Sequence, residues 1–404
     1  MQTYAITHLG HLGDGVAEGR IYAPLTVPGD VVQGELVGDR LEDIRIEKPS
    51  DLRIKAMCRH FKSCGGCGLQ HVQDAYLADW KANVVRTALE LVGLETDIRP
   101  TITSSPASRR RATFAARRTK SGALAGFHMR GSDTVIPVPD CMLLTPSLIG
   151  ALQMCEKLAV EGASRKHGLD VTVTDTVHGL DVSVTGGQPL AAVLRARLAQ
   201  VSEAYGLTRI VWNNELAATR SPSVVQFDGI DVPLPPGAFL QATEHGENTL
   251  RKCVADIVSG AGRVADLFAG CGTFALPLAR KADVLAVEGI ADMTEAMMQG
   301  WRHATGLKAL QTETRDLFRN PLLPEELRKM DAVVIDPPRA GAAAQIAELG
   351  RSALNCVAHV SCNPQTFARD AKTLVSAGFS LDWVQPVDQF RWSPHIELVG
   401  AFRR

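Results

Sequence analysis

A cysteine at the end of an expected buried strand is the first residue that could do chemistry. The run that begins at Val357 reads as a short strand that stops at Asn363-Pro364, and an amphipathic helix follows from about Thr366. Cys362 therefore lies at the C-terminal end of a strand, where open α/β sheets bind their ligands. Its thiol is either a nucleophile or a small buried hydrophobe, because free cysteine is among the most buried residue types.

A carboxylate close to the C-terminus is the second candidate. Glu397 lies within a strongly β-prone run, residues 394–399. A carboxylate inside an apolar strand costs free energy unless it has a partner. Glu397 is therefore either a functional group or a structural carboxylate with satisfied hydrogen bonds.

A glycine-rich turn predicts a site for a nucleoside cofactor. An expected strand that contains Asp266 leads into a turn with Gly270 and Gly272, and the next strand ends at Glu288. This arrangement suits a carboxylate that binds ribose hydroxyls while the glycine loop approaches the ligand. The G-x-G-x-x-G pattern of dinucleotide sites is absent, and the preceding Asp is typical of loops that hold S-adenosylmethionine. Asp316, after the presumed third strand, is placed to contact an adenine amine.

The fourth expected strand ends in an acid followed by two prolines, Asp336-Pro337-Pro338. Such an ending projects polar groups into the cleft. Amino-methylating enzymes use a similar motif with an aromatic residue after the prolines, which stacks on the flipped base. Arg339 stands at that position here, which weakens an N-methylation interpretation.

A thiol, a carboxylate and a methyl donor together favour methylation of uracil C5. This carbon is too weak a nucleophile to take a methyl group directly, but addition of a thiolate at C6 makes it enolate-like. A base must then remove the C5 proton so that the thiol can leave. Cys362 would be the nucleophile and Glu397 the base, and the target base would be flipped out of its stack.

Four cysteines predict a metal centre. Cys58, Cys64 and Cys67 have a C-x5-C-x2-C spacing in a loop with two glycines, and Cys141 is the best candidate for a fourth ligand. Four thiolates fit either tetrahedral zinc or an iron–sulfur cluster. The spacing lacks the paired C-x2-C of a zinc ribbon, which favours [4Fe-4S], and it lacks the C-x3-C-x2-C of radical enzymes. Unrelated thiols in a loop are the alternative.

Five arginines flank an expected strand in the most basic stretch of the chain. The net charge of −1 gives no global case for nucleic acid, so the argument is local. Arginine forks match phosphate geometry and would position an RNA backbone, while a solvated charged strand is the alternative. The predicted RNA-binding residues are Arg109, Arg110, Arg111, Arg117 and Arg118.

The elements that position these residues suggest three domains in 404 residues. Residues 1–52 have the short β-prone runs of a small TRAM-like or OB-like barrel, or of a structural β cap. Residues 53–235 read as a central α+β domain with the cysteine loop. Residues 236–404 alternate strands and helices, which predicts an α/β, Rossmann-like S-adenosylmethionine-dependent methyltransferase domain. No signal peptide or apolar run of about 20 residues is evident, so a cytoplasmic protein without membrane contact is expected.

The chain resembles the class I uracil-5 RNA methyltransferases, in particular the rRNA branch with a TRAM domain and a [4Fe-4S] cluster. The resemblance covers nearly the whole length. It rests on Gly10-His11-Leu12-Gly13-Asp14-Gly15-Val16-Ala17, Cys58/Cys64/Cys67/Cys141, Phe239-Leu240-Gln241, Asp266-Leu267-Phe268-Ala269-Gly270-Cys271-Gly272, Glu288, Asp336-Pro337-Pro338-Arg339, Ser361-Cys362-Asn363-Pro364 and His395-Ile396-Glu397.

The resemblance implies 5-methyluridine formation in 23S rRNA, because tRNA-modifying relatives generally lack the cluster and the TRAM domain. It also implies [4Fe-4S] for the four thiols. One departure is Thr243, where the family commonly has Asn. Alternatives are the same reaction on tRNA, or a non-catalytic rRNA-binding assembly factor, for which Thr243 is the only hint. The protein is expected to be a monomer. The expected cofactor-binding residues are Gln241, Asp266, Phe268, Gly270, Gly272, Glu288, Asp316 and Asp336.

Overall fold

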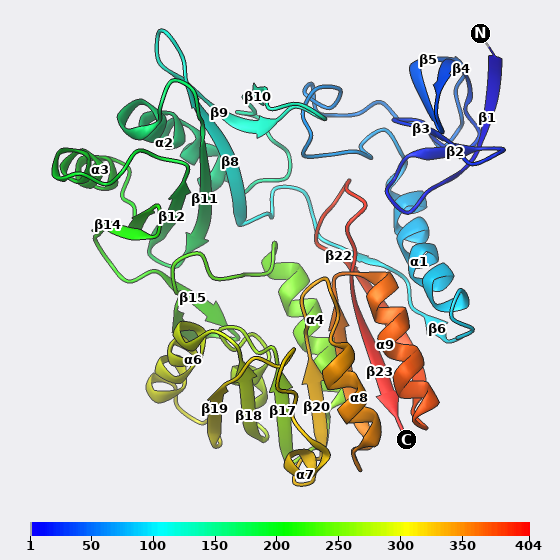
Figure 1. Cartoon of the computed structure of the whole chain (residues 1–404), viewed down its shortest axis with the longest axis vertical. Helices are drawn as coiled ribbons and strands as arrows, with labels where there is room; N and C mark the ends of the chain where they lie inside the picture. The colour runs from blue at the N-terminus through cyan, green and yellow to red at the C-terminus, as the bar shows by residue number, and fades with distance from the viewer. Residues whose placement is uncertain (1) are drawn as a thin grey trace.

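The structure, a computed structural model, describes residues 2–404; residue 1 of the expected barrel lies outside the described residues. Its strands form a closed barrel, a seven-stranded sheet, a two-stranded sheet and a nine-stranded sheet. Figure 1 shows the barrel and the seven-stranded sheet apart from each other, with the largest sheet below both. None of the described helices is long and apolar enough to cross a membrane.

The N-terminal barrel closes in the order β1-β2-β3-β5-β4. Side chains alternate between the two faces of a strand, and here Tyr4, Ile6, Val32 and Leu41 point inward and form the barrel core. The barrel strands are β1 (Gln2–Leu9), β2 (Gly15–Ala17), β3 (Ile21–Ala23), β4 (Val31–Val37) and β5 (Arg40–Lys48).

The seven-stranded sheet has the order β10-β9-β8-β11-β12-β13-β14. Leu148, Leu152 and Leu158 of α2 are buried in the core that this sheet shares with α2 and α3. Its elements are β8 (Arg111–Arg118), β9 (Ala123–His128), β10 (Val135–Ile136), α2 (Pro146–Gly162), β11 (Leu169–Thr176), β12 (Gly179–Thr185), α3 (Ala192–Ala204), β13 (Arg209–Trp212) and β14 (Glu215–Thr219). The two-stranded sheet is β15 (Val224–Phe227) with β16 (Ile230–Pro233).

The nine-stranded sheet has the order β19-β18-β17-β20-β21-β23-β22-β6, and β7 also pairs with β22. From β19 to β21 the neighbours are parallel, while β23 is antiparallel to both β21 and β22. The strands are β6 (Asp97–Ile98), β7 (Ile102–Thr103), β17 (Arg263–Leu267), β18 (Asp283–Glu288), β19 (Leu310–Thr314), β20 (Ala332–Ile335), β21 (Cys356–Ser361), β22 (Ser380–Asp388) and β23 (Glu397–Arg403). Strands β6 and β7 thus bring residues 97–103 into a sheet built mainly from the C-terminal third.

Helices cover both faces of this sheet. Adjacent residues of β20 point to opposite faces, so Val334 packs with α4 and α6 while Val333 packs with α1, α8 and α9. Helix α1 therefore links the N-terminal half to the large sheet, and Figure 1 shows it running from the barrel toward that sheet. These helices are α1 (Asp74–Glu90), α4 (Glu244–Ile257), α5 (Ala275–Leu278), α6 (Ala291–His303), α7 (Pro324–Leu327), α8 (Ala343–Arg351) and α9 (Pro364–Ser376).

Candidate active site

The carboxyl edge of the large sheet gathers the candidate catalytic residues. Strands β20 and β21 are parallel, so Asp336 and Cys362, which directly follow them, lie at the same edge. Strand β23 runs the other way and begins at Glu397. Ser361 pairs with Leu398, and continuing this antiparallel register places Cys362 beside Glu397. Asp336, Cys362 and Glu397 therefore meet although they are distant in the sequence.

Burial raises the pKa of all three groups above their ordinary values. Burial raises the pKa of Glu397 to about 8; Asp336 adds to the rise, and Gln389 and Arg339 oppose it. Burial also raises the pKa of Asp336 to about 7, although this residue is only partly buried. The Cys362 thiol is half-buried, and burial together with the two carboxylates raises its pKa to about 11. The site therefore disfavours the charged form of all three groups when no ligand supplies positive charge.

Arg339 is a member of this site that the sequence did not single out as functional. It lowers the pKa of both Cys362 and Glu397, and its Nη2 lies 3.2 Å from Nδ1 of His395. Its carbonyl accepts a hydrogen bond from Nδ2 of Asn363 at 3.1 Å, which ties the loop after β20 to the loop after β21. The available signal was its position directly after the two prolines.

The glycine-rich turn after β17 places several candidate cofactor residues together. The Glu288 carboxylate accepts hydrogen bonds from the N–H of Gly270 at 2.9 Å and of Ile290 at 3.0 Å. Gly272 has φ +96°, and a Cβ there would meet Met297 at 2.8 Å, so the turn requires glycine. The turn and the end of β18 thus form one hydrogen-bonded unit.

Two aromatic rings stand beside this turn. Phe268 has φ +61°, and its ring centroid lies 5.3 Å from that of Phe318. Asp316 accepts a hydrogen bond from the N–H of Phe318 at 3.0 Å. Phe318 contacts both predicted residues, Phe268 and Asp316; it is about half exposed and was not identified from the sequence.

Asp266 lies beneath the edge of the sheet. It is fully buried, and neither carboxylate oxygen has a well-formed hydrogen bond to the described residues. Burial, with Asp336 and Glu288 nearby, raises its pKa well above the ordinary value. In this arrangement Asp266 supports the floor of the site and has no surface for direct contact with a ligand.

Gln241 reaches the site from the segment before α4. It is buried, and its Oε1 accepts a hydrogen bond from Nε2 of Gln389 at 2.5 Å. Thr243, two residues further on, is the N-cap of α4: its hydroxyl accepts from the N–H of Gly246 at 2.9 Å and lies 2.8 Å from the Ser104 hydroxyl. Thr243 therefore has a structural role of its own at the position where Asn is common.

The five arginines fall into two groups. Arg110 forms a 2.5 Å ion pair with buried Glu247, and Arg109 donates to the Arg111 carbonyl at 3.0 Å. Arg111 donates to the Gly237 carbonyl at 3.4 Å. Of the five, only Arg117 and Arg118, at the end of β8, are exposed. The guanidinium groups of Arg109, Arg110 and Arg111 therefore make contacts within the protein, while Arg117 and Arg118 face solvent.

The four predicted metal ligands line one cavity of about 610 Å³. Burial raises the pKa of Cys67 to about 12, and the other three thiols add smaller contributions to the rise. No group of three potential ligands among residues 2–404 is close enough to hold a single metal ion. The four thiols therefore line one cavity, and a metal centre there stays a prediction.

The same cavity is lined by residues from distant parts of the chain. Arg339 and His395, at the carboxyl edge of the large sheet, border it together with Arg109. The N–H groups of Gly68 and Leu69, directly after the cysteine loop, donate to the Trp392 carbonyl at 2.9 and 3.1 Å. The cysteine loop is therefore far from Glu397 in sequence but joined to the loop that precedes it.

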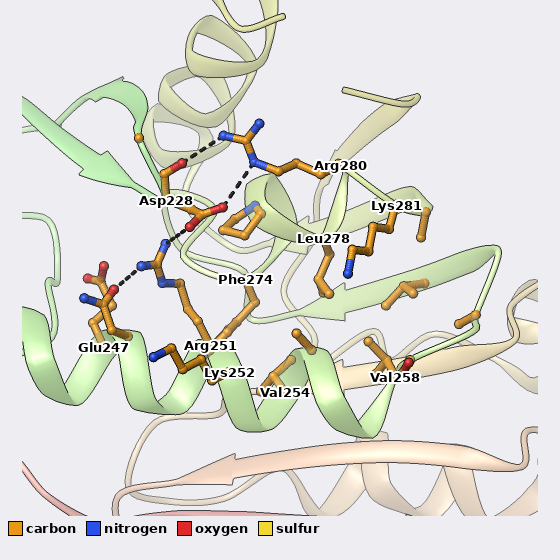
Figure 2. Close-up of a pocket in the computed structure, with 18 of the residues that line it drawn as sticks. Asp228, Glu247, Arg251, Lys252, Val254, Val258, Phe274, Leu278, Arg280 and Lys281 are labelled. Atoms are coloured by element: carbon orange, nitrogen blue, oxygen red, sulfur yellow. Dashed lines mark hydrogen bonds and ion pairs between the residues drawn. The ribbon is translucent and has the colours of Figure 1, made fainter. Parts of the chain in front are cut away.

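A separate cleft of about 580 Å³ runs along α4 and contains none of the predicted site residues. Figure 2 shows Asp228 between Arg251 and Arg280, with nitrogen–oxygen distances of 3.8 and 3.1 Å. Val254 and Phe274 contribute to its apolar floor. Because this cleft contains none of the residues predicted to do chemistry, the carboxyl edge of the sheet is the better candidate for an active site.

Comparison with known proteins identifies the family. Residues 303–403 match the family described as tRNA (Uracil-5-)-methyltransferase. An uncharacterized RNA methyltransferase of Caulobacter vibrioides is 43% identical, and the match covers 100% of both chains. A 23S rRNA (uracil(1939)-C(5))-methyltransferase of a Shewanella species is 30% identical, over 99% of this chain and 95% of that protein. The chain therefore belongs to the uracil-5 RNA methyltransferase family, as its motifs indicated.

A solved structure shares the whole fold. The tRNA (uracil-54, C5)-methyltransferase of Pyrococcus abyssi, solved in complex with S-adenosyl-L-homocysteine, has a TM-score of 0.77 and 22% sequence identity, with 99% of both chains covered. The predicted α/β methyltransferase fold with a small N-terminal barrel is thereby confirmed.

Proposed function

We propose that this protein methylates C5 of a uridine in 23S rRNA, with S-adenosylmethionine as the methyl donor. The observation that carries the proposal is the position of Cys362 beside Glu397 on facing strands, with Asp336 and Arg339 around them. The name of the Shewanella relative supports 23S rRNA as the substrate. The ligand of the Pyrococcus structure supports the methyl donor.

In the proposed reaction Cys362 acts first and last. Its thiolate forms a bond to uracil C6, and the electron pair of the C5–C6 double bond moves onto C5 and O4. C5 then takes the methyl group as the sulfonium–methyl bond breaks, which leaves S-adenosylhomocysteine. Glu397 removes the C5 proton, the double bond re-forms and the Cys362 thiolate departs. The product is 5-methyluridine, and the proton remains on Glu397 until solvent takes it.

The charges of the site support these roles. The pKa values of Cys362 and Glu397 both lie above neutral in the free protein, so each group needs help to ionise. Arg339 lowers both, and a sulfonium bound at this edge would add a second positive charge. Asp336 would hold polar groups of the substrate or of the methyl donor.

The proposed binding site for the methyl donor follows the edge from β17 to β19. The Glu288 carboxylate, held by two backbone N–H groups, would accept hydrogen bonds from the ribose hydroxyls. Phe268 and Phe318 would contact the adenine ring, with Asp316 beside them. Gln241, at the other end of the site, would contact the polar end of the cofactor.

The four cysteines are proposed to hold a [4Fe-4S] cluster. The lining of their cavity, with three arginines that balance the negative charge of thiolates, supports this proposal. A cluster there would have a structural role, with Cys58, Cys64, Cys67 and Cys141 as its ligands. The N–H groups of Gly68 and Leu69 hydrogen-bond to the Trp392 carbonyl, so a bound cluster would also help to fix the loop that contains Trp392.

The exposed residues Arg117 and Arg118 are proposed to contact the RNA backbone. Arg109, Arg110 and Arg111 would instead act through the protein contacts that they already make. A tRNA substrate is the second candidate, because the matching family description names tRNA. The non-catalytic interpretation loses its motivation, since the Thr243 hydroxyl caps α4.

A methyl-transfer assay tests the substrate. The protein is incubated with radiolabelled S-adenosylmethionine and, separately, with unmodified 23S rRNA and tRNA transcripts, and the labelled nucleoside is identified after digestion. Labelled 5-methyluridine in 23S rRNA alone is the expected result, and the uridine equivalent to the Shewanella target is the first to map. Label in tRNA alone would replace the rRNA proposal, and label on an exocyclic amine would overturn the reaction.

A further inference from the structure

We propose that Gln389 is a positioning residue that holds Glu397 and Gln241 in one hydrogen-bonded unit, so that the catalytic base is joined to the cofactor end of the site. The inference deepens the proposed function and rests on it. Gln389 is 3% exposed and directly follows β22, at the start of the loop 389–396 that leads into β23.

The hydrogen bonds of Gln389 fix the orientation of its amide. The N–H of Ala242 donates to Oε1 of Gln389 at 2.9 Å, and a backbone N–H can only donate, so this atom must be the oxygen. Nε2 then donates one hydrogen to Oε1 of Gln241 at 2.5 Å. An amide nitrogen carries two hydrogens, and the second is left for Glu397. Val387 of β22 pairs with Glu397 of β23, so Gln389, two residues further on, is the diagonal neighbour of Glu397 on the same face of the sheet. Gln389 also lowers the pKa of this carboxyl.

The surroundings leave Gln389 little freedom to move. A Cβ added to Gly246, in the first turn of α4, would lie 2.8 Å from Cβ of Gln389 and 3.1 Å from its Oε1. Glycine at this position is therefore what allows α4 to pack so closely against Gln389. The amide is confined between α4 and the segment that carries Gln241.

Both ends of the loop are held by a buried lysine of α1. Lys81 is fully buried, and its Nζ lies 2.6 Å from Oδ1 of Asp388. The same ammonium donates to the His395 carbonyl at 2.9 Å. The Lys81 ammonium thus holds Asp388, which precedes Gln389, and His395, which lies two residues before Glu397. These two contacts help to set the distance between the Gln389 amide and the Glu397 carboxylate.

The acidity of Glu397 depends on groups from several elements. Asp336, at the end of β20, disfavours the ionised carboxylate, and Cys362 faces it from β21. Arg339, after β20, favours ionisation. His395 lies two residues away on the same loop, and burial and Arg339 lower its pKa, so it contributes no positive charge at neutral pH. Against these groups, Gln389 supplies a neutral donor to the carboxylate that does not depend on pH.

The test compares Gln389→Leu and Gln389→Glu with a matched control, Gln385→Leu. Gln385 is also buried on β22, but its Nε2 donates to the Pro100 and Pro386 carbonyls at 2.7 and 3.0 Å. The release of methylated RNA from the covalent complex, which requires ionised Glu397, is measured across neutral and alkaline pH. The KM for S-adenosylmethionine is measured alongside. Gln389→Glu keeps the side-chain shape, so it serves if the leucine variant does not fold.

In both Gln389 variants, the rise in RNA release at alkaline pH is expected to move to higher pH by about one unit. At a fixed pH below this rise, release should then be about tenfold slower. Both variants should also raise the KM for S-adenosylmethionine. Gln385→Leu should leave the position of the rise unchanged. An unshifted rise in both Gln389 variants would overturn the inference. If wild-type protein forms no covalent complex with RNA, the proposed function itself fails, and this result is distinct from an unshifted rise.

Discussion

At the scale of single residues, the proposed active site holds three acidic groups and few positive charges. Asp336, Cys362 and Glu397 lie together, and Arg339 is the cation that lowers the pKa of both the thiol and the base. The neutral forms that dominate in the free protein would protect the thiol from side reactions. The site is therefore expected to become active only when substrate and methyl donor are both bound.

Replacement of Cys362 by Ala should reduce methyl transfer to background, because C6 then has no nucleophile. Cofactor binding should persist, since the cofactor end of the edge is unchanged. Single-turnover methyl transfer and calorimetric titration with S-adenosylhomocysteine separate the two effects. Ordinary turnover by this variant would sink the thiolate mechanism.

Proton removal should depend on pH through Glu397. Its pKa in the folded protein is raised to about 8, and only the ionised carboxylate can accept the C5 proton. Release of product should therefore be slow at neutral pH and rise as the pH passes about 8. A release rate that is already at its plateau well below neutral would contradict this assignment.

Glu397→Gln should stall after methyl transfer, leaving protein attached to RNA, because the amide cannot accept the proton. A denaturing gel with radiolabelled donor detects the complex. Arg339→Ala is the matched comparison. Loss of this cation should raise the pKa of Glu397 by about one unit, which slows product release by about tenfold without stopping it. Release by Glu397→Gln at the wild-type rate would show that another group is the base.

At the scale of elements, the loop 389–396 is held from the N-terminal half of the chain. Lys81 of α1 anchors both of its ends, and Asp74 at the start of α1 accepts from Nε1 of Trp392 at 3.0 Å. Burial lowers the pKa of Lys81 and raises that of Asp388, while each partner opposes the shift of the other. The position of Glu397 therefore depends on the packing of α1.

Lys81→Met should destabilise the protein by about 3 kcal/mol, because it leaves Asp388 buried without its partner. Urea unfolding monitored by circular dichroism gives the free energy of unfolding. Lys157→Met is a suitable control: Lys157 forms a 2.7 Å pair with Glu161 on the surface of α2, and its loss should cost less than about 1 kcal/mol. Equal effects of the two substitutions would argue against a buried anchor.

At the scale of the whole molecule, the cavity lined by the four cysteines lies where the N-terminal half meets the carboxyl edge of the large sheet. Cys141 belongs to the segment between the central strands and α2, while Arg339 and His395 belong to the large sheet. Protein purified without oxygen is expected to contain about four iron and four sulfide per chain. Elemental analysis that found one zinc and no iron would reject the cluster.

Residues at the ends of strands could be predicted from the sequence, whereas residues whose contacts join distant segments of the chain could not. Cys362 and Glu397 were recognisable because buried strands and turn residues place them at one edge. Gln389 and Lys81 had no such signal: a single glutamine has no characteristic spacing, and a lysine in an amphipathic helix is expected on the surface. Arg110 was predicted to bind RNA, but its ion pair with Glu247 joins distant segments and no local pattern reveals it. The pairing of β6 and β7 with β22 was unpredicted for the same reason.

A covalent trap shows directly whether Cys362 attacks a uracil. The protein is mixed with S-adenosylmethionine and a 23S rRNA transcript that contains 5-fluorouridine, and a denaturing gel follows; tRNA is run in parallel. Fluorine at C5 cannot leave as a proton, so the enzyme should remain attached to its RNA. A shifted band that is lost in Cys362→Ala is expected. Absence of a band with both RNAs, or a band that survives this substitution, would contradict an attack of Cys362 on uracil.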